Sequence, residues 1–163
     1  MELIRSSEGI SEVAEALAGA QLFAADTEAA GYHRYHDRIC LLQLSTRDAT
    51  FLVDTLAVQE LQALAPLFES PSHEVVLHDA DYDLRLLARD FDIRVGGLFD
   101  TKIAAQLLGE PAIGLGALVE KHLGHRLDKK HQRADWAQRP LPPDMLAYAA
   151  EDTRHLPALR HRL

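Results

Sequence analysis

The sequence predicts an α/β fold built on a mixed sheet. Short apolar segments with strand character follow one another near the N-terminus, and further strand segments then alternate with segments whose apolar residues recur at helical spacing. Two of the early strands are separated only by Thr46-Arg47-Asp48, which is short enough for a hairpin and adds an antiparallel pair. At 163 residues and 47% hydrophobic content, the chain suits one domain with one continuous core.

The first half of the chain supplies two helices and a hairpin. Residues 8–20 carry apolar side chains at helical spacing, with Ser11 as the candidate N-cap. Three strands are expected to follow, over residues 22–28, 38–45 and 50–53. A second helix is expected from Val58 to Phe68, and Ser70-Pro71-Ser72 ends it.

Helix and strand alternate in the second half. The expected order is a strand over 74–77, a helix over 84–91, a strand over 93–99 that Gly96-Gly97 interrupts, and a short helix over 103–108. The last third reads as helical apart from the polar loop 129–143, where three prolines oppose helix formation. We expect substrate contacts in this loop.

Composition and charge exclude several classes of protein. No apolar stretch approaches the roughly 20 residues that a membrane-spanning helix needs, and the start of the chain lacks the pattern of a secretion signal. Cys40, the only cysteine, lies in an apolar run, so we expect a buried thiol and a reducing cytoplasm. The net charge of −8 argues against a nucleic-acid partner, but residues 120–139 carry six basic residues against three acidic ones.

Asp26 and Glu28 form the first candidate site. They lie two residues apart on a predicted strand, so both side chains point to the same face of the sheet. Two carboxylates this close stay ionised at neutral pH only if a cation or a hydrogen-bond donor lies between them. Such a pair is often a solvated edge, but here the apolar residues 23–25 precede it. A buried strand that ends in two acids is unusual for a solvated edge, so this pair is a candidate functional site.

The segment 78–83 is the second candidate site. It follows an apolar strand and opens a helix, which is the strand end where ligands of α/β sheets gather. Asp79 and Asp81 are most simply explained as caps of that helix. Asp83 differs, because it lies within the helix and next to the apolar stripe that begins at Leu84.

Tyr148 and Asp152 form the third candidate site. Four residues apart on a helix, they are neighbours on one face, and Pro142 or Pro143 suits the first turn of that helix. A helical tyrosine beside an acid is ordinarily core packing with a satisfied hydroxyl. This pair therefore indicates a catalytic site only in combination with the other two candidate sites.

Together, the three sites resemble the motifs of the ribonuclease D group of the DEDD exonucleases, in the DEDDy subclass whose third motif is Tyr-x-x-x-Asp. Asp26-Thr27-Glu28 is similar to the first motif, His78-x-x-x-Tyr82-Asp83 to the second and Tyr148-x-x-x-Asp152 to the third. Residues 99–109, 114–124 and 135–141 are also similar to that family. The resemblance implies a ribonuclease H-like fold, in which helices flank a five-stranded mixed sheet with one antiparallel strand.

The resemblance also implies an activity and a site. The expected enzyme is a 3′-5′ exonuclease that hydrolyses nucleic acid, RNA in preference to DNA, from single-stranded 3′ ends and releases nucleoside 5′-monophosphates by two-metal-ion catalysis. Oxygen ligands favour Mg²⁺ or Mn²⁺ as the two divalent cations. The expected catalytic residues are Asp26, Glu28, Asp83, Tyr148 and Asp152, of which the four acids are the expected metal ligands and the tyrosine orients the attacking water. The expected substrate-binding residues are Thr27, His78, Tyr82, Lys129, Lys130, Arg133 and Arg139.

The sequence departs from the family pattern in two respects. After Glu28, many relatives carry a bulky residue and an arginine-glutamate pair, whereas this chain has Ala29-Ala30-Gly31-Tyr32-His33, so contacts to the terminal nucleotide are open. Longer ribonuclease D enzymes append helical nucleic-acid-binding domains, whereas we expect one exonuclease domain over 1–163, either a trimmed catalytic domain or a short relative.

The alternatives are a DNA 3′-5′ exonuclease, a dinucleotide-specific oligoribonuclease and a non-catalytic nucleic-acid-binding module. The last would be expected to lack at least one metal-binding carboxylate, and all four are present. Asp135-Trp136 and Arg139-Pro140-Leu141 favour the ribonuclease D group. No membrane partner is expected, and the sequence does not predict the oligomeric state.

Overall fold

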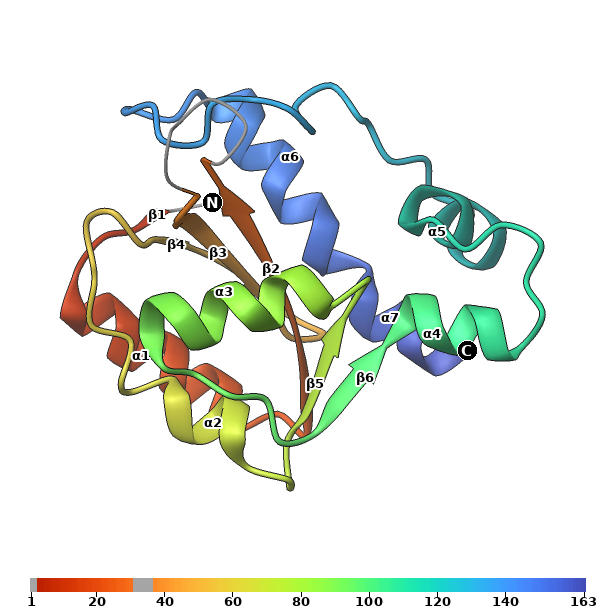
Figure 1. Cartoon of the computed structure of the whole chain (residues 1–163), viewed down its shortest axis with the longest axis horizontal. Coiled ribbons are helices and arrows are strands. Elements are labelled where there is room, and N and C mark those ends of the chain that lie inside the picture. Colours follow the sequence, from red (N-terminus) through yellow and green to blue (C-terminus); the bar gives the residue numbers. More distant parts are fainter. Residues whose placement is uncertain (1–2, 31–36) are drawn as a thin grey trace.

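The computed structural model describes residues 3–30 and 37–163, and in this part of the chain helices cover both faces of a six-stranded mixed sheet (Figure 1). The strands are β1 (Leu3–Ile4), β2 (Leu22–Ala29), β3 (Ile39–Ser45), β4 (Thr50–Asp54), β5 (Glu74–Leu77) and β6 (Leu98–Asp100). Their order in the sheet is β1-β4-β3-β2-β5-β6. β3 is antiparallel to both of its neighbours, and the other adjacent pairs are parallel. The prediction of an α/β fold with one antiparallel strand is confirmed.

Two details of the sheet differ from the prediction. The sixth strand is β1, whose two residues pair with β4 and are too few to show an alternating pattern in the sequence. β6 covers Leu98–Asp100 instead of the expected 93–99. Gly96 and Gly97 lie so close to the carbonyl groups of Glu69 and His73 that a side chain would clash there, and the ladder with β5 begins only after them.

Seven helices are described. They are α1 (Ser7–Ala18), α2 (Ala65–Glu69), α3 (Asp81–Phe91), α4 (Thr101–Leu107), α5 (Leu115–Leu123), α6 (Pro143–Arg154) and α7 (Leu156–Arg162). The expected helix from Val58 to Phe68 is wrong in its first part, because α2 includes only its end. Val58, Leu61 and Leu64 are buried in a core cluster, so their spacing reflects burial of a turn-rich segment.

The N-cap of α1 is Ser6, and the prediction of Ser11 was wrong. The Ser6 Oγ accepts a hydrogen bond from the Gly9 N–H at 3.1 Å, as an N-cap side chain should. Ser11 lies inside the helix, where its hydroxyl donates to the Ser7 carbonyl at 3.3 Å.

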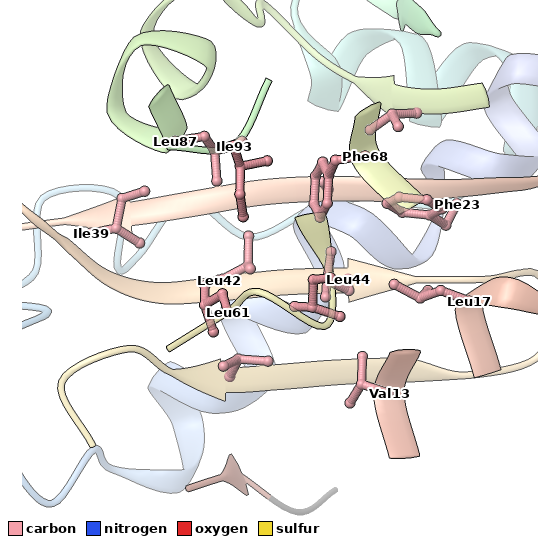
Figure 2. Close-up of a cluster of buried hydrophobic side chains, with 14 of the residues drawn as sticks. Val13, Leu17, Phe23, Ile39, Leu42, Leu44, Leu61, Phe68, Leu87 and Ile93 are labelled. Carbon is pink, nitrogen blue, oxygen red and sulfur yellow. The ribbon is translucent and has the colours of Figure 1, made fainter. Parts of the chain in front are cut away.

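Alternate residues of β2 enter different cores. Phe23 and Ala25 pack on the side of α1, α2 and α3, where the Phe23 and Phe68 rings meet edge to face with centroids 5.1 Å apart (Figure 2). Ala24 packs on the opposite side, with Leu118 of α5 and with the buried residues of α7. Because side chains alternate along a strand, the same pattern directs Asp26 and Glu28 to the side covered by α4 to α7.

Three further points that the sequence analysis discussed concern Cys40, membrane-spanning segments and the residues after Glu28. Cys40 is a free, buried thiol in the core cluster beneath α6, as expected. No helix within residues 3–30 and 37–163 combines the length and the apolar character that crossing a bilayer requires. Gly31, Tyr32 and His33, where the sequence departs from the family pattern, lie outside the described residues.

Arg139 anchors the loop between α5 and α6 to the sheet. Its Nε and Nη2 donate to the two carboxylate oxygens of Asp54 at 3.1 and 2.9 Å. Nη2 also donates to the Cys40 carbonyl, and Nη1 donates to the carbonyls of Trp136 and Gln138. These bonds use all five N–H groups of the guanidinium. Contact of Arg139 with substrate stays a prediction, and it requires that one of these bonds be exchanged for a bond to phosphate.

The Asp54 carboxylate is the buried half of this anchor, with a side chain only 2% exposed. Burial raises the pKa of Asp54, but hydrogen bonds and charge from Arg139 outweigh burial and hold that pKa below its ordinary value. Arg5 is a second cation near the same carboxylate, at 3.5 Å, and its side chain is mostly exposed.

Arg139→Ala is expected to lower the free energy of unfolding by about 3 kcal/mol, because Asp54 loses its bidentate partner while remaining buried. Urea-induced unfolding at neutral pH measures this change. Arg85→Ala is the matched control, since it removes an exposed pair with Asp81 and should change the same quantity by less than about 0.5 kcal/mol. Equal effects of the two substitutions would contradict the anchoring role.

Candidate active site

Three carboxylates meet near the end of β2. Asp26 and Glu28 belong to this strand, and Asp152 comes from α6, which packs across β2, β3 and β4. One carboxylate oxygen from each residue lies within 4.8 Å of the others. A set of carboxylate oxygens at this spacing matches the ligands that hard divalent cations prefer. The residues therefore fit a divalent cation.

Burial raises the pKa of each of these acids, and the negative charge of nearby acids adds to the rise. Burial is the largest cause for Asp26, followed by the charges of Asp83, Asp152 and Glu28. Burial and then the charges of Asp152 and Asp83 raise the pKa of Glu28 to about 9. The pKa of Asp152 rises to about 7 through burial and the charge of Glu151. Ionising all three acids together is costly unless a cation lies among them.

Asp83, the fourth predicted ligand, lies close to this group without joining it. It sits in the first turn of α3 and accepts a hydrogen bond from the Thr27 hydroxyl. Thr27 points away from Asp26 and Glu28 by the alternation of β2, so the bond holds Asp83 on the α3 side. Burial raises the pKa of Asp83 to about 6, against the lowering effect of the Thr27 bonds. Its metal-binding role stays a prediction, as does substrate binding by Thr27.

Tyr148 and the three acids line one cavity of about 450 Å³. The cavity is also lined by His78, Asp79, Lys102, Lys129 and Gln132, among other residues. Burial, and then the charges of Asp152, Glu28 and Asp26, raise the pKa of Tyr148 above its ordinary value. The phenol therefore keeps its proton at neutral pH, and its O–H group is available as a hydrogen-bond donor. A larger cavity of about 960 Å³, lined by parts of α1, α7 and the β3–β4 turn, contains none of these acids.

Two of the predicted substrate-binding residues line the active-site cavity. Lys129 is exposed there, at the start of the polar loop. The Nδ1 of His78 lies 2.9 Å from the Thr101 hydroxyl. Burial lowers the pKa of His78, so its ring is neutral at physiological pH.

The other predicted substrate-binding residues do not line this cavity. The Tyr82 hydroxyl donates to Asp37 at 2.6 Å, and Lys130 lies 3.7 Å from Asp144 with its side chain 67% exposed. Arg133 is likewise outside the lining. Contacts of Tyr82, Lys130 and Arg133 with substrate stay predictions, and they require a substrate that extends beyond the cavity.

Gln43 is a residue of the site that the sequence analysis missed. It lies on β3 directly opposite Asp26, and its buried Nε2 donates to the Asp26 carboxylate at 3.3 Å. A hydrogen bond from Gln43 also opposes the rise in the pKa of Glu28. The available signal was a single amide within the apolar run of residues 39–44, where a polar side chain needs a partner.

Asp100 makes two sets of structural hydrogen bonds. It is the N-cap of α4 and accepts from the Lys102 N–H at 2.8 Å. It also accepts from the N–H groups of Asp79 and Ala80 at 3.1 and 2.8 Å, which fixes the turn before α3. The expectation that Asp79 or Asp81 caps α3 by a side-chain hydrogen bond was wrong, because Ala80 is the N-cap residue and no side chain caps this helix, although Asp81 does lie in its first turn.

Comparisons with known proteins agree with this site. A sequence profile described as a 3′-5′ exonuclease matches residues 1–163. The exosome complex exonuclease RRP6 of Saccharomyces cerevisiae is 39% identical over 154 residues, which cover 94% of this chain and 21% of that protein. Escherichia coli RNase D superposes with a TM-score of 0.92 at 29% identity, over 99% of this chain and 43% of that one. Brucella melitensis NrnC with bound Mg²⁺ has a TM-score of 0.77 at 28% identity, over 88% of this chain and 71% of that one.

The chain spans about a fifth of the length of the first curated relatives that it matches, from 17% of RRP6-like 3 of Arabidopsis thaliana to 21% of yeast RRP6. The likeness therefore concerns one part of each longer protein. Within that part, the superposition on RNase D confirms the predicted ribonuclease H-like fold.

The pKa shifts predict how stability depends on pH when no cation is bound. Asp152 and Glu28 have folded-state pKa values of about 7 and about 9, against ordinary values of 3.8 and 4.5. Between these limits the folded protein holds protons that the unfolded chain has released, so its stability falls as the pH rises. From pH 5 to 7 the free energy of unfolding in EDTA should fall by on the order of 1 kcal/mol per pH unit.

Saturating Mn²⁺ should reduce this fall, because the cation favours the ionised carboxylates. Urea-induced unfolding at several pH values, with EDTA or with Mn²⁺, measures both slopes. Asp26→Asn is the control, since removal of one charge should flatten the slope in EDTA. A slope that neither Mn²⁺ nor this substitution alters would contradict the electrostatic account.

Proposed function

The chain belongs to the 3′-5′ exonuclease family that includes ribonuclease D and RRP6, and from this premise we propose that it hydrolyses RNA from the 3′ end and releases nucleoside 5′-monophosphates. Residues 1–163 would act as a single exonuclease domain. The observation that carries this proposal is the meeting of Asp26, Glu28 and Asp152 beside Tyr148 in one cavity.

Two divalent cations, Mg²⁺ or Mn²⁺, are the proposed cofactors. The support is the oxygen-only ligand set of Asp26, Glu28 and Asp152, together with the Mg²⁺ in the related NrnC. Asp83 would support the second cation from the α3 side, through water. Its contribution to the raised pKa values of Asp26 and Glu28 argues that it lies within electrostatic reach of the same cations.

The chain's own residues would then divide the work of hydrolysis. When bound, the cations supply neutralisation of phosphate charge and a lower pKa for water. Tyr148 would donate its phenolic hydrogen bond and so orient the water that attacks the phosphorus. We assign it this orienting role and not that of a general base, because a phenol with an ordinary pKa of about 10 is protonated at neutral pH. The bond from phosphorus to the 3′ oxygen breaks, which leaves a shortened strand with a 3′ hydroxyl.

Lys129 and Lys102 would contribute positive charge to a cavity that is otherwise acidic. Both line the active-site cavity, and the Lys102 ammonium lies 2.6 Å from Asp79. A phosphate next to the terminal nucleotide would find its counter-charge there.

RNA is favoured over DNA because the matched relatives are named ribonuclease D and exosome exonuclease. The buried free Cys40 supports a reducing cytoplasm as the location.

Purified protein with Mn²⁺ should shorten 5′-labelled RNA stepwise from its 3′ end and release nucleoside 5′-monophosphates. Gel analysis of RNA and DNA strands of several lengths measures both the direction and the sugar preference. Asp26→Asn should abolish shortening, because it removes a ligand from the centre of the carboxylate group. Tyr148→Phe should slow cleavage by about 10²-fold or more, because it removes the group that orients water.

The Tyr148→Phe protein should bind Mn²⁺ like the wild type, which separates an orienting role from a structural one. Cuts within the strand, or unchanged activity of Asp26→Asn, would refute the proposal. Shortening of DNA alone would identify the protein as a DNA exonuclease. Cleavage of dinucleotides alone would identify it as an oligoribonuclease. Binding of RNA without cleavage would favour a non-catalytic module.

A further inference from the structure

A second cluster of metal-ligand side chains lies outside the cavity of the catalytic acids. It consists of His125, Glu151 and His155, whose ligand atoms all lie within 4.8 Å of one another. The Nε2 atoms of both histidines lie 2.9 Å from the same oxygen of Glu151, Oε2. The two imidazole rings are tilted toward each other with centroids 4.4 Å apart. Two ring nitrogens and one carboxylate oxygen therefore converge on one point.

The local structure explains why these three side chains meet. Glu151 and His155 are four residues apart, so they lie on one face at the end of α6. Gly124 ends α5 in the left-handed conformation, with φ of 68°, and turns the chain so that His125 reaches α6. Arg154 binds the other oxygen of Glu151, Oε1, which leaves Oε2 directed at the two histidines.

We propose that His125, Glu151 and His155 bind a Zn²⁺ ion or a similar transition-metal ion. Two imidazoles with one carboxylate, and a fourth position for water, form a common three-ligand zinc set. Imidazole nitrogen is a poor ligand for Mg²⁺, so this site would discriminate against the Mg²⁺ that the catalytic carboxylates accept. The side chain of His125 is 49% exposed, that of Glu151 26% and that of His155 17%, so an ion has access from solvent and a water can complete its coordination.

The distances from Glu151 to the two histidines are close to those of a zinc site. Zinc bonds of about 2.0–2.1 Å to nitrogen and oxygen place tetrahedral ligands about 3.4 Å apart, so each nitrogen must retreat from Glu151 by about half an ångström. Each ring must present an unprotonated Nε2, and a neutral ring does so by carrying its hydrogen on Nδ1 instead. The simpler role of the cluster is a hydrogen-bonded network without metal, in which both Nε2–H groups donate to Glu151.

The ion would join the loop after α5 to the last turn of α6. This turn follows directly on Asp152, so the metal would brace the helix that presents the catalytic acid. A ligand that binds only the folded state raises its thermal stability in proportion to the logarithm of its concentration above Kd. Zn²⁺ should therefore raise the Tm of the wild-type protein in a way that depends on His125 and His155.

Isothermal titration with Zn²⁺, in buffer that contains saturating Mg²⁺ to occupy the catalytic carboxylates, tests the site directly. The wild type should bind one equivalent, and the double variant His125→Ala/His155→Ala should bind at least about tenfold more weakly and lose the rise in Tm. Co²⁺ should give the visible absorption of a four-coordinate ion with the wild type only. His161→Ala is the matched control, because its ring bonds the Pro157 carbonyl outside the cluster and its loss should change neither result.

Absence of Zn²⁺ binding by the wild type would overturn the proposal and leave the hydrogen-bonded network. Equal Zn²⁺ binding by the wild type and the double variant would also overturn it, by placing the ion elsewhere. Circular dichroism checks that each variant folds. If loss of the partly buried His155 prevents folding, His125→Ala alone gives the decisive comparison, since this side chain is half exposed and its loss leaves α6 intact. None of these readouts depends on exonuclease activity.

Discussion

Repulsion among three partly buried carboxylates is the constraint on which the rest of the site depends. The sheet delivers Asp26 and Glu28 at the end of a strand that is otherwise buried, and α6 brings Asp152 against them. Burial is the largest cause of the raised pKa of each acid, and the charge of Asp152 adds to it at Asp26 and Glu28. Folding therefore concentrates negative charge where water screens it poorly, and this arrangement favours a divalent cation at that point. Gln43 supplies the one nearby side-chain donor to Asp26 that the described residues record.

The second half of the chain serves this centre through α6. One face of the helix carries Tyr148 and Asp152 into the cavity, and its beginning follows the loop that Arg139 fastens to Asp54. All five N–H groups of Arg139 are engaged within the protein, so the basic charge in this loop that lines the cavity comes from Lys129. The net charge of −8 is thus compatible with a nucleic-acid partner, because the acids at the centre are matched to cations and not to phosphate.

The sequence predicted the fold class and the three sites because their signals are local. Alternation along a strand put Asp26 and Glu28 on one face, and a spacing of four put Tyr148 beside Asp152. Features that depend on distant contacts were missed or wrong. Val58 and Leu61 have helical spacing but are buried in turns, and the pairing of Arg139 with Asp54, 85 positions earlier, was missed. The contact of Gln43 with Asp26 follows only from the register of β3 against β2.

A crystal soaked in Mn²⁺ and measured at a wavelength where manganese scatters anomalously tests the central claim most directly. The account predicts an anomalous peak within coordination distance of carboxylate oxygens from Asp26, Glu28 and Asp152, and loss of that peak in the Asp26→Asn protein. Three carboxylates that remain without a manganese peak at a saturating concentration would contradict it, because the affinity that their repulsion should create would then be missing.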